Sequence, residues 1–179
     1  SLASNALAEF VERVVVSVSW MPEGDPEFDR LSSARLLLFQ FRDNVGREAE
    51  RLGKMRANRH GLSLSDSVEI HEWRGRVNQQ WKQLEIDARR IGDPVFTLAL
   101  DGIRERYFAH LRPLNDYLLA HGRSPGEAAL PVEGYSAMAV PAIASIAPAV
   151  DRLAQLSADL AEHRKQVTRS EFERNALIF

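Results

Sequence analysis

The chain has 179 residues, 45% of them hydrophobic and 27% charged, a composition typical of one compact domain rather than of a disordered segment. The formal charge of -2 provides no basic excess to attract a phosphate backbone, which argues against a nucleic-acid partner. The lack of cysteine excludes disulfides, thiolate catalysis and thiolate metal sites, and it suits an oxidising compartment without establishing one.

Apolar residues recur at helical spacing along nearly the whole chain and strand patterns are nearly missing, so we predict an all-α fold. The first expected helix covers residues 2–19 and ends where two prolines and a glycine interrupt residues 20–26. Residues 1–25 are therefore interpreted as an N-terminal helix and linker, and residues 26–179 as one helical-bundle domain. No segment is expected to reach the roughly 20 apolar residues that a membrane span requires.

The next two expected helices, residues 26–57 and 63–91, carry polar side chains on lines that aliphatic residues would normally occupy. Ser63 or Ser65 is the expected cap of the second helix. Glu48 lies on the inward line of the helix expected over residues 26–57, and Arg74 on that of the helix expected over residues 63–91. Burying such charged groups lowers stability unless they are paired. If the two helices pack antiparallel across their short turn, Glu48 and Arg74 approach each other near the middle of the bundle.

Asp93 and Pro94 are the expected cap and first-turn proline of a further helix that ends at Gly122. Pro113 lies inside this helix, where its missing N–H is expected to bend it. The inward line of this helix is predicted to be Phe96, Leu100, Ile103, Tyr107, Leu111, Leu114 and Leu118.

A loop is expected over residues 122–134 and a last helix from about Ser136. The residues that the last helix is expected to turn inward are Ile143, Ile146, Val150, Leu153, Leu160 and Val167. Residues 168–175 are polar all round, which is typical of a rod leaving the bundle. Four long amphipathic helices with short connections predict an up-down-up-down four-helix bundle with an additional N-terminal helix.

The candidate ligand-binding residues are charged and aromatic side chains of the middle helices: Arg47, Glu48, Arg51, Arg74, Trp81 and Tyr107. A guanidinium between helices could hold the oxygens of a small anion in bidentate fashion. Two competing interpretations stay open: a Glu48–Arg74 ion pair that only fixes the register of the helices, and aromatic rings that only fill the core.

Motifs typical of enzymes and metal sites are missing from the sequence. The histidines form no Glu-x-x-His or His-x-x-x-His pair, and neither a P-loop nor a G-x-G-x-x-G, G-x-S-x-G or H-E-x-x-H motif occurs. We therefore expect no catalytic residue, no metal and no cofactor. An enzyme built in a bundle would need a titrating pair, and His110 near Arg106 and Tyr107 is the candidate.

Several segments occur in an order that resembles a known family. They are GREAERLGK at 46–54, LSLSDS at 62–67, WRGRVNQQW at 73–81, GDP at 92–94, RYFAHLRPLNDYLLAHG at 106–122 and YSAMAVPAIASIAPAVDRLAQL at 135–156. From residue 31 to about residue 165 the chain is similar to the extracytoplasmic helical sensor regions of bacterial methyl-accepting chemotaxis proteins and related membrane receptors, including the nitrate- and nitrite-sensing type. It departs from that type at Ala49, where an arginine is common, and at residues 137–139, where the resemblance suggests an aromatic residue.

The resemblance implies a periplasmic sensor domain that lies between two membrane spans of a parent chain and forms a homodimer. It also implies a small-molecule ligand, with a small anion as the candidate, and a last helix that continues towards the second span. The alternative is a structural or adaptor bundle that mediates protein–protein contacts, with Val14, Val16 and Val18 at a dimer interface. Arginines that share an internal cavity would favour the sensor, and arginines that point into solvent would favour the adaptor.

Overall fold

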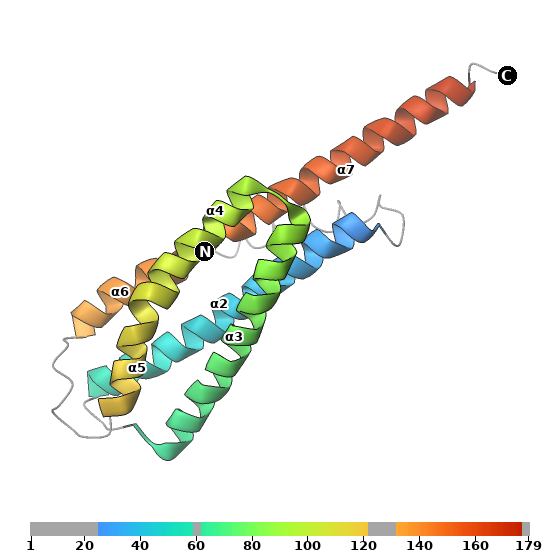
Figure 1. Cartoon of the computed structure of the whole chain (residues 1–179). Helices are drawn as coiled ribbons and strands as arrows, with labels where there is room; N and C mark the ends of the chain where they lie inside the picture. Colours follow the sequence, from blue (N-terminus) through green and yellow to red (C-terminus); the bar gives the residue numbers. More distant parts are fainter. Residues whose placement is uncertain (1–24, 59–61, 122–131, 177–179) are drawn as a thin grey trace, which may run out of the picture.

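The computed structural model describes residues 25–58, 62–121 and 132–176, and over these ranges the chain forms four long helical rods without strands (Figure 1). The first two rods are α2 (Pro26–Asn58) and α3 (Leu64–Ile91). The third rod joins α4 (Pro94–Ile103), the π-helix η1 (Arg104–Leu111) and α5 (Arg112–His121). The fourth rod joins α6 (Val132–Ala144) and α7 (Ala147–Ala176). The all-α prediction is confirmed for these residues, and the helix expected over residues 2–19 lies outside them.

The helix boundaries follow local capping chemistry. Ser63 caps α3 through a capping box, because its hydroxyl accepts from the backbone N–H of Asp66 while the Asp66 carboxylate accepts from the backbone N–H of Ser63. Gly92 ends α3 in the left-handed conformation, with φ of 69°, and donates its N–H to the carbonyl of Ala88. Asp93 then caps α4, as its place before a proline predicts.

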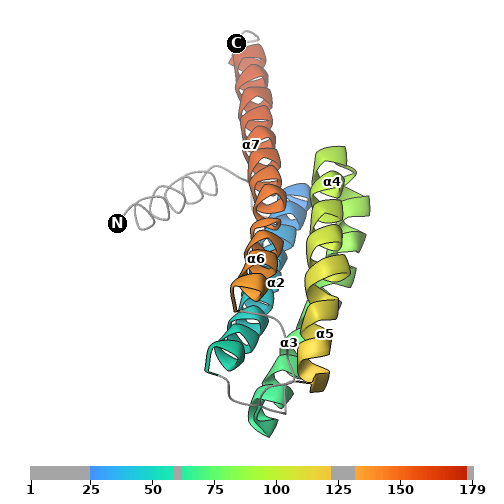
Figure 2. The ribbon, with the colours of Figure 1, turned by 90° about the vertical axis from the view of Figure 1, so that its left-hand side faces the viewer.

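Contacts between neighbouring rods join early residues of one rod to late residues of the other. Asn44 on α2 donates to Gln80 on α3, and Arg51, further along α2, reaches Glu69, which lies nearer the start of α3. The same rule holds for Glu85–Arg104 and Arg74–Asp116 between α3 and the third rod, and for Asp25–Arg164 and Gly53–Tyr135 between the α2 side and the fourth rod. The rods lie side by side around one elongated core, as the second view shows (Figure 2).

The inward line of the third rod differs from its prediction at one position. The buried residues of this line are Phe96, Leu100, Ile103, Tyr107, Leu111, Asn115 and Leu118. Asn115 takes the buried place that the sequence pattern assigns to Leu114, and Leu114 is only half-buried. The π-helix η1 explains the difference, because its wider turns hold more residues and the next inward position therefore falls one residue later along the chain. Pro113 stands just after η1 and has no N–H with which to close an α-helical hydrogen bond there.

The fourth rod also departs from its prediction. α6 begins at Val132 instead of near Ser136, and a turn at residues 145–146 separates it from α7, where Pro148 occupies the first turn. The buried positions are Tyr135, Ala139, Ala142, Ile146, Ala149, Leu153 and Ser157, whereas Ile143, Val150 and Leu160 are half-buried and Val167 is exposed. The prediction is confirmed for Ile146 and Leu153, and alanines take most of the other buried places.

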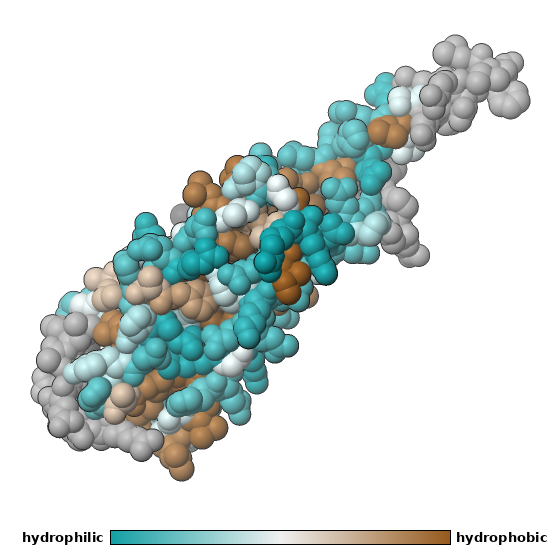
Figure 3. Space-filling model, in the orientation of Figure 1, coloured by the Kyte–Doolittle hydropathy of each residue, from teal (hydrophilic) through white to brown (hydrophobic). Residues whose placement is uncertain are grey.

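The last part of α7 extends past the other rods (Figures 1 and 2). Residues 162–170 are all exposed, which agrees with the polar pattern of a rod that leaves the bundle. The space-filling view shows mainly hydrophilic residues along this protruding segment (Figure 3).

One helical stretch, Glu133–Ser170, contains an 18-residue window that is long and apolar enough to cross a membrane. This corrects the expectation that no segment would qualify. The window owes its hydropathy to the alanine-rich residues of the fourth rod, and 28% of it is buried in the bundle. Core helices of soluble proteins satisfy the same criterion of length and composition.

Candidate functional site

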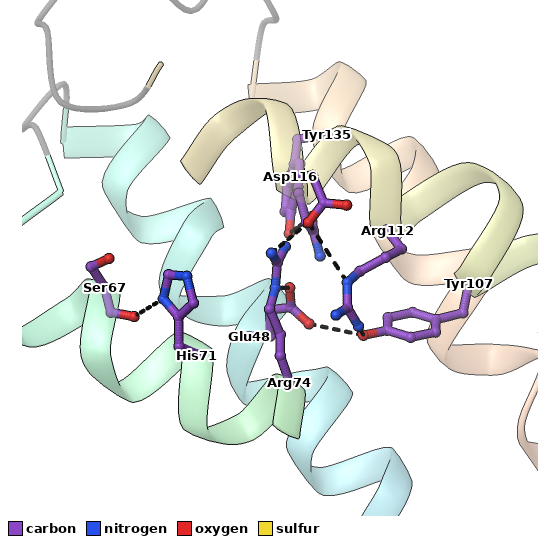
Figure 4. A network of polar contacts seen from close by, with 9 residues as sticks. Glu48, Ser67, His71, Arg74, Tyr107, Arg112, Asp116 and Tyr135 are labelled. Atoms are coloured by element: carbon purple, nitrogen blue, oxygen red, sulfur yellow. Dashed lines mark hydrogen bonds and ion pairs between the residues drawn. The ribbon is translucent and has the colours of Figure 1, made fainter. Parts of the chain in front are cut away.

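An ion pair between α2 and α3 forms the centre of the candidate site. The carboxylate of Glu48 is fully buried, and the side chain of Arg74 is 10% exposed. Arg74 donates from Nε to Glu48 Oε1 at 2.6 Å, and Figure 4 shows the two side chains facing each other between the helices. This confirms the predicted approach of Glu48 and Arg74 in mid-bundle.

The second carboxylate oxygen of Glu48 is bound from the third rod. Tyr107, a residue of η1, donates its hydroxyl to Glu48 Oε2 at 2.9 Å and accepts from Nη1 of Arg112 at 3.2 Å. Burial, and next the charge of Glu48, raise the pKa of Tyr107 far above its usual value of 10.0. Tyr107 therefore keeps its proton and acts as a hydrogen-bond donor, so that both oxygens of Glu48 have partners.

Residues of α5 and α6 complete the group of polar side chains. Asp116 accepts from Nη1 of Arg74, and the hydroxyl of Tyr135 donates to Oδ1 of the fully buried Asn115 at 3.1 Å. Burial, and next the charge of Glu48, raise the pKa of Tyr135 above its usual value. Figure 4 shows Tyr135 and Asp116 beside the guanidinium of Arg74. We call these side chains the mid-bundle network: Glu48, Arg74, Tyr107, Arg112, Asn115, Asp116 and Tyr135.

The mid-bundle network is incompletely satisfied in the part of the chain that the structure describes. Nη2 of Arg74 and Nδ2 of Asn115 are both buried and have no hydrogen-bond partner there. Buried polar groups in folded proteins nearly always have partners, and leaving one unpaired costs about 1–3 kcal/mol. Both orphaned atoms are hydrogen-bond donors, so each is able to donate to an acceptor oxygen of a further molecule.

The charges of the mid-bundle network balance. Arg74 and Arg112 supply two positive charges, and Glu48 and Asp116 supply two negative ones. The two guanidiniums already lie against these carboxylates, with Nε of Arg112 at 3.7 Å from Asp116. An added anion would therefore meet carboxylates as well as guanidiniums, which weakens the expectation of a strongly bound anion.

Trp81 lies in the core beside the network. It is 8% exposed, and its ring centroid lies 5.8 Å from that of Phe41 and 4.8 Å from that of Phe108. The guanidinium carbon of Arg104 lies over the Trp81 ring, 5.7 Å from its centroid. Tyr107 joins the same cluster through Phe108 at 4.8 Å. These contacts favour the interpretation of Trp81 as a core residue that supports Tyr107.

Arg47 and Arg51 do not meet Arg74 in a common cavity. Arg47 is an exposed residue that pairs with Asp43 of its own helix at 2.9 Å. Arg51 points to the start of α3, where it binds Asp66 at 2.8 Å and Glu69 at 2.7 Å. Their four-residue spacing indicated a shared helix face correctly, but that face is turned away from the network.

His110, the candidate for a titrating pair, is also outside the network. Its side chain is 59% exposed and lies 3.2 Å from Glu105, which is itself 68% exposed. Tyr107 points inward from the same π-helix, so the two side chains do not combine into one site.

Sequence reasoning missed Arg112, Asn115, Asp116 and Tyr135. Asn115 was hidden by the π-helix, because a regular α-helix would have turned Leu114 inward instead. Tyr135 stood in a predicted loop boundary, although an aromatic residue that begins a helical run was a usable signal. Comparisons with protein-family models, with curated proteins and with solved structures found no match.

Proposed function

We propose that this chain is the sensor module of a bacterial membrane receptor, an up-down-up-down bundle that recognises a small solute at the mid-bundle network. The observation that carries the proposal is a pair of buried donors, on Arg74 and Asn115, that have no hydrogen-bond partner among the described residues. An ion pair that only fixed helix register would gain nothing from leaving two buried donor groups of the same network unpaired. A recognition site needs such groups, because they are satisfied only when the solute is present.

The location of the network supports a role in signalling. Its side chains come from α2, α3, the third rod and α6, so a bound molecule affects the packing of all four rods at once. A solute shifts such an equilibrium only if it binds one packing of the helices better than the other. Satisfying donors that lie between rods provides that difference.

The protruding part of α7 is the proposed output element. α7 is tied to the start of the other rods by Arg152, which binds Asp93 at 2.6 Å, and by Arg164, which binds Asp25 at 3.2 Å. A displacement of α6 at the network is thereby passed along one rod to the exposed residues 162–170. The resemblance to extracytoplasmic sensor regions supports a periplasmic location, a homodimer and a parent chain that spans the membrane.

A thermal-shift screen of the full chain tests the recognition step. Amides, amino acids, dicarboxylates and nitrate are compared on the wild type, Asn115→Leu and Arg47→Gln. We expect at least one solute class to raise the melting temperature of the wild type and of Arg47→Gln, but not of Asn115→Leu. The proposal fails if no class stabilises the wild type, or if Asn115→Leu responds like the wild type.

Spin labels test the output step. Because the chain has no cysteine, Lys165→Cys on α7 and Thr97→Cys on α4 can be labelled selectively. Both positions are exposed. The stabilising solute should change the distance distribution between the labels, and an unchanged distribution would remove α7 as the output element.

A second function, that of an adaptor bundle, is favoured by one feature of the surface. A groove between α4 and the fourth rod is lined largely by apolar residues, and Val95 and Leu98 in it are 53% and 70% exposed. Arg47 is exposed, as the adaptor interpretation expects, whereas Arg51 binds carboxylates of α3 and Arg74 is buried. Leu98→Glu tests this function, because it should abolish self-association or capture of a partner chain while leaving the solute response of the network intact.

A further inference from the structure

The register of the third rod decides which residue faces the network. The buried residues from Phe96 to Leu118 are spaced by 4, 3, 4, 4, 4 and 3 positions. An inward line on a regular α-helix alternates spacings of 3 and 4, since one turn holds 3.6 residues. The three consecutive spacings of 4 run from Ile103 to Asn115 and coincide with the π-helix η1.

The same sequence fits a second register. If η1 were regular α-helix, the inward line after Leu111 would continue through Leu114, as the periodicity of the sequence predicts. Leu114 is half-buried beside the core and lies one position before Asn115, so turning α5 about its axis by up to about 100°, the angle between successive residues, exchanges the two. In that register an aliphatic side chain replaces the orphaned amide.

The π register therefore adds the amide of Asn115 to a network in which Arg74 already has a free donor among the described residues. It places Asn115 next to Asp116, which binds Arg74, and against Tyr135, whose hydroxyl occupies the amide oxygen and leaves the amide nitrogen free. Arg74 has spent Nε on Glu48 and Nη1 on Asp116, which leaves Nη2. Both remaining groups are N–H donors, and an acceptor oxygen satisfies such a donor.

The charge of the guest follows from its surroundings. Glu48 and Asp116 lie as close to Arg74 as hydrogen bonds allow, so a guest at Nη2 meets two carboxylates as well as the guanidinium. A guest without net charge keeps the balance of the network, whereas an anion is repelled by both carboxylates.

We infer that the mid-bundle network binds a small uncharged molecule through a carbonyl or hydroxyl oxygen, and that it does so only when the third rod holds Asn115 on its inward line, which the natural sequence achieves through the π-helix η1. The inference rests on the proposed sensor function and replaces its candidate anion with a neutral acceptor. Water is the smallest member of this class, and amides or alcohols are the larger ones. A guest that binds Asn115 favours the π register over the register with Leu114 inside, which makes binding and helix register one event.

Side-chain NMR on the isotope-labelled full chain tests the inference. Acetamide is titrated as the neutral probe, and sodium acetate and sodium nitrate as anions of similar size. We expect acetamide to shift the Asn115 amide and Arg74 guanidinium resonances, or a bound water to show a cross-peak with the Asn115 amide that acetamide does not remove. The first result assigns an organic solute and the second assigns solvent as the source of the same oxygen acceptor.

Two variants separate the register from the amide. Deleting Ala109, an exposed residue of η1, changes the inward spacings to 4, 3, 4, 3, 4 and 3 and so keeps Asn115 inside a regular α-helix. The deletion variant should bind the guest at least as tightly as the wild type. Asn115→Leu should weaken binding about tenfold or more, the equivalent of one hydrogen bond, and Asn78→Leu at an exposed site should not.

Several results would overturn the inference. Acetate or nitrate binding with no effect of acetamide contradicts the neutral guest, yet leaves the proposed sensor function standing if Asn115→Leu abolishes that binding. A folded deletion variant that has lost the guest contradicts the role of the register. If Asn115 shows no solute shift and no water cross-peak, the site itself is contradicted. If the deletion variant does not fold, the titration of Asn115→Leu against Asn78→Leu still decides.

Discussion

Removing the guanidinium of Arg74 should be among the most destabilising single changes in the described chain. Arg74→Met keeps an unbranched side chain of similar length but leaves the fully buried carboxylate of Glu48 with the hydroxyl of Tyr107 as its remaining partner. Breaking a buried ion pair from one side costs about 3–5 kcal/mol, because the uncompensated charge stays in the core. We expect Arg74→Met to lower the free energy of unfolding by this amount.

A double-mutant cycle isolates the pair. Glu48→Leu combined with Arg74→Met removes both charges, and the double variant should recover to within about 2 kcal/mol of the wild type, since apolar replacement of a buried pair is often nearly neutral. Arg76→Met is the matched control on α3: Arg76 is 59% exposed and lies 3.7 Å from Glu72, so its loss should cost less than about 1 kcal/mol.

Urea unfolding followed by circular dichroism measures these differences, provided that the slopes of the transitions agree among the variants. A loss of less than about 1 kcal/mol for Arg74→Met, or equal losses for Arg74→Met and Arg76→Met, would refute the argument that Glu48 depends on Arg74.

Three further predictions concern single contacts. Tyr107→Phe removes the hydroxyl that binds Glu48 and should lower the free energy of unfolding by about 1–3 kcal/mol in urea, and an unchanged value would contradict that bond. Gly53→Ala places a methyl group 3.7 Å from an aromatic ring, an ordinary contact, so it should raise the stability of α2 by about 0.5–1 kcal/mol in thermal unfolding; a lower melting temperature would contradict this. The pKa of Asp93 lies below its ordinary value of 3.8, mainly because Arg152 donates hydrogen bonds to its carboxylate. The ionised Asp93 therefore stabilises the fold fully above pH 3.8, and this contribution is lost as the pH falls through the lower pKa of the folded state. Arg152→Gln should flatten this acid limb of a stability–pH profile, and an unchanged limb would contradict the cause.

Local chemistry was predictable from the sequence wherever it depends on neighbouring residues. The caps at Ser63 and Asp93 and the inward position of Glu48 and Arg74 follow from patterns within one helix, and the structure has them. The inward face of the fourth rod was predictable only at Ile146 and Leu153, because alanines occupy most of its other buried places and hydrophobic size does not mark them.

The candidate site was predictable only in part, because its members come from different rods. The position of Asn115 depends on a π-helix, which the sequence pattern does not reveal, since both Leu114 and Asn115 are compatible with a helical line. Arg47 and Arg51 were assigned to the site from spacing alone, and spacing shows which residues share a face without showing where that face points. Trp81 is inward as predicted, and its neighbours are core aromatic rings.

The size of the signal that the mid-bundle network can send is limited by its two free donors. Satisfying a buried donor yields about 1.5 kcal/mol, so a guest that binds both contributes about 3 kcal/mol, or roughly a hundredfold change in an equilibrium. This is enough to move two registers of the third rod from about 1:10 to about 10:1. Moving them from 1:99 to 99:1 would need about 5.5 kcal/mol, which two neutral hydrogen bonds do not supply.

On the proposed mechanism the registers with Asn115 or Leu114 inside must therefore differ by no more than about 1.4 kcal/mol, and both must be populated without the guest. Relaxation-dispersion NMR of α5 should detect this exchange on the microsecond-to-millisecond scale, and the Ala109 deletion should abolish it by removing the alternative register.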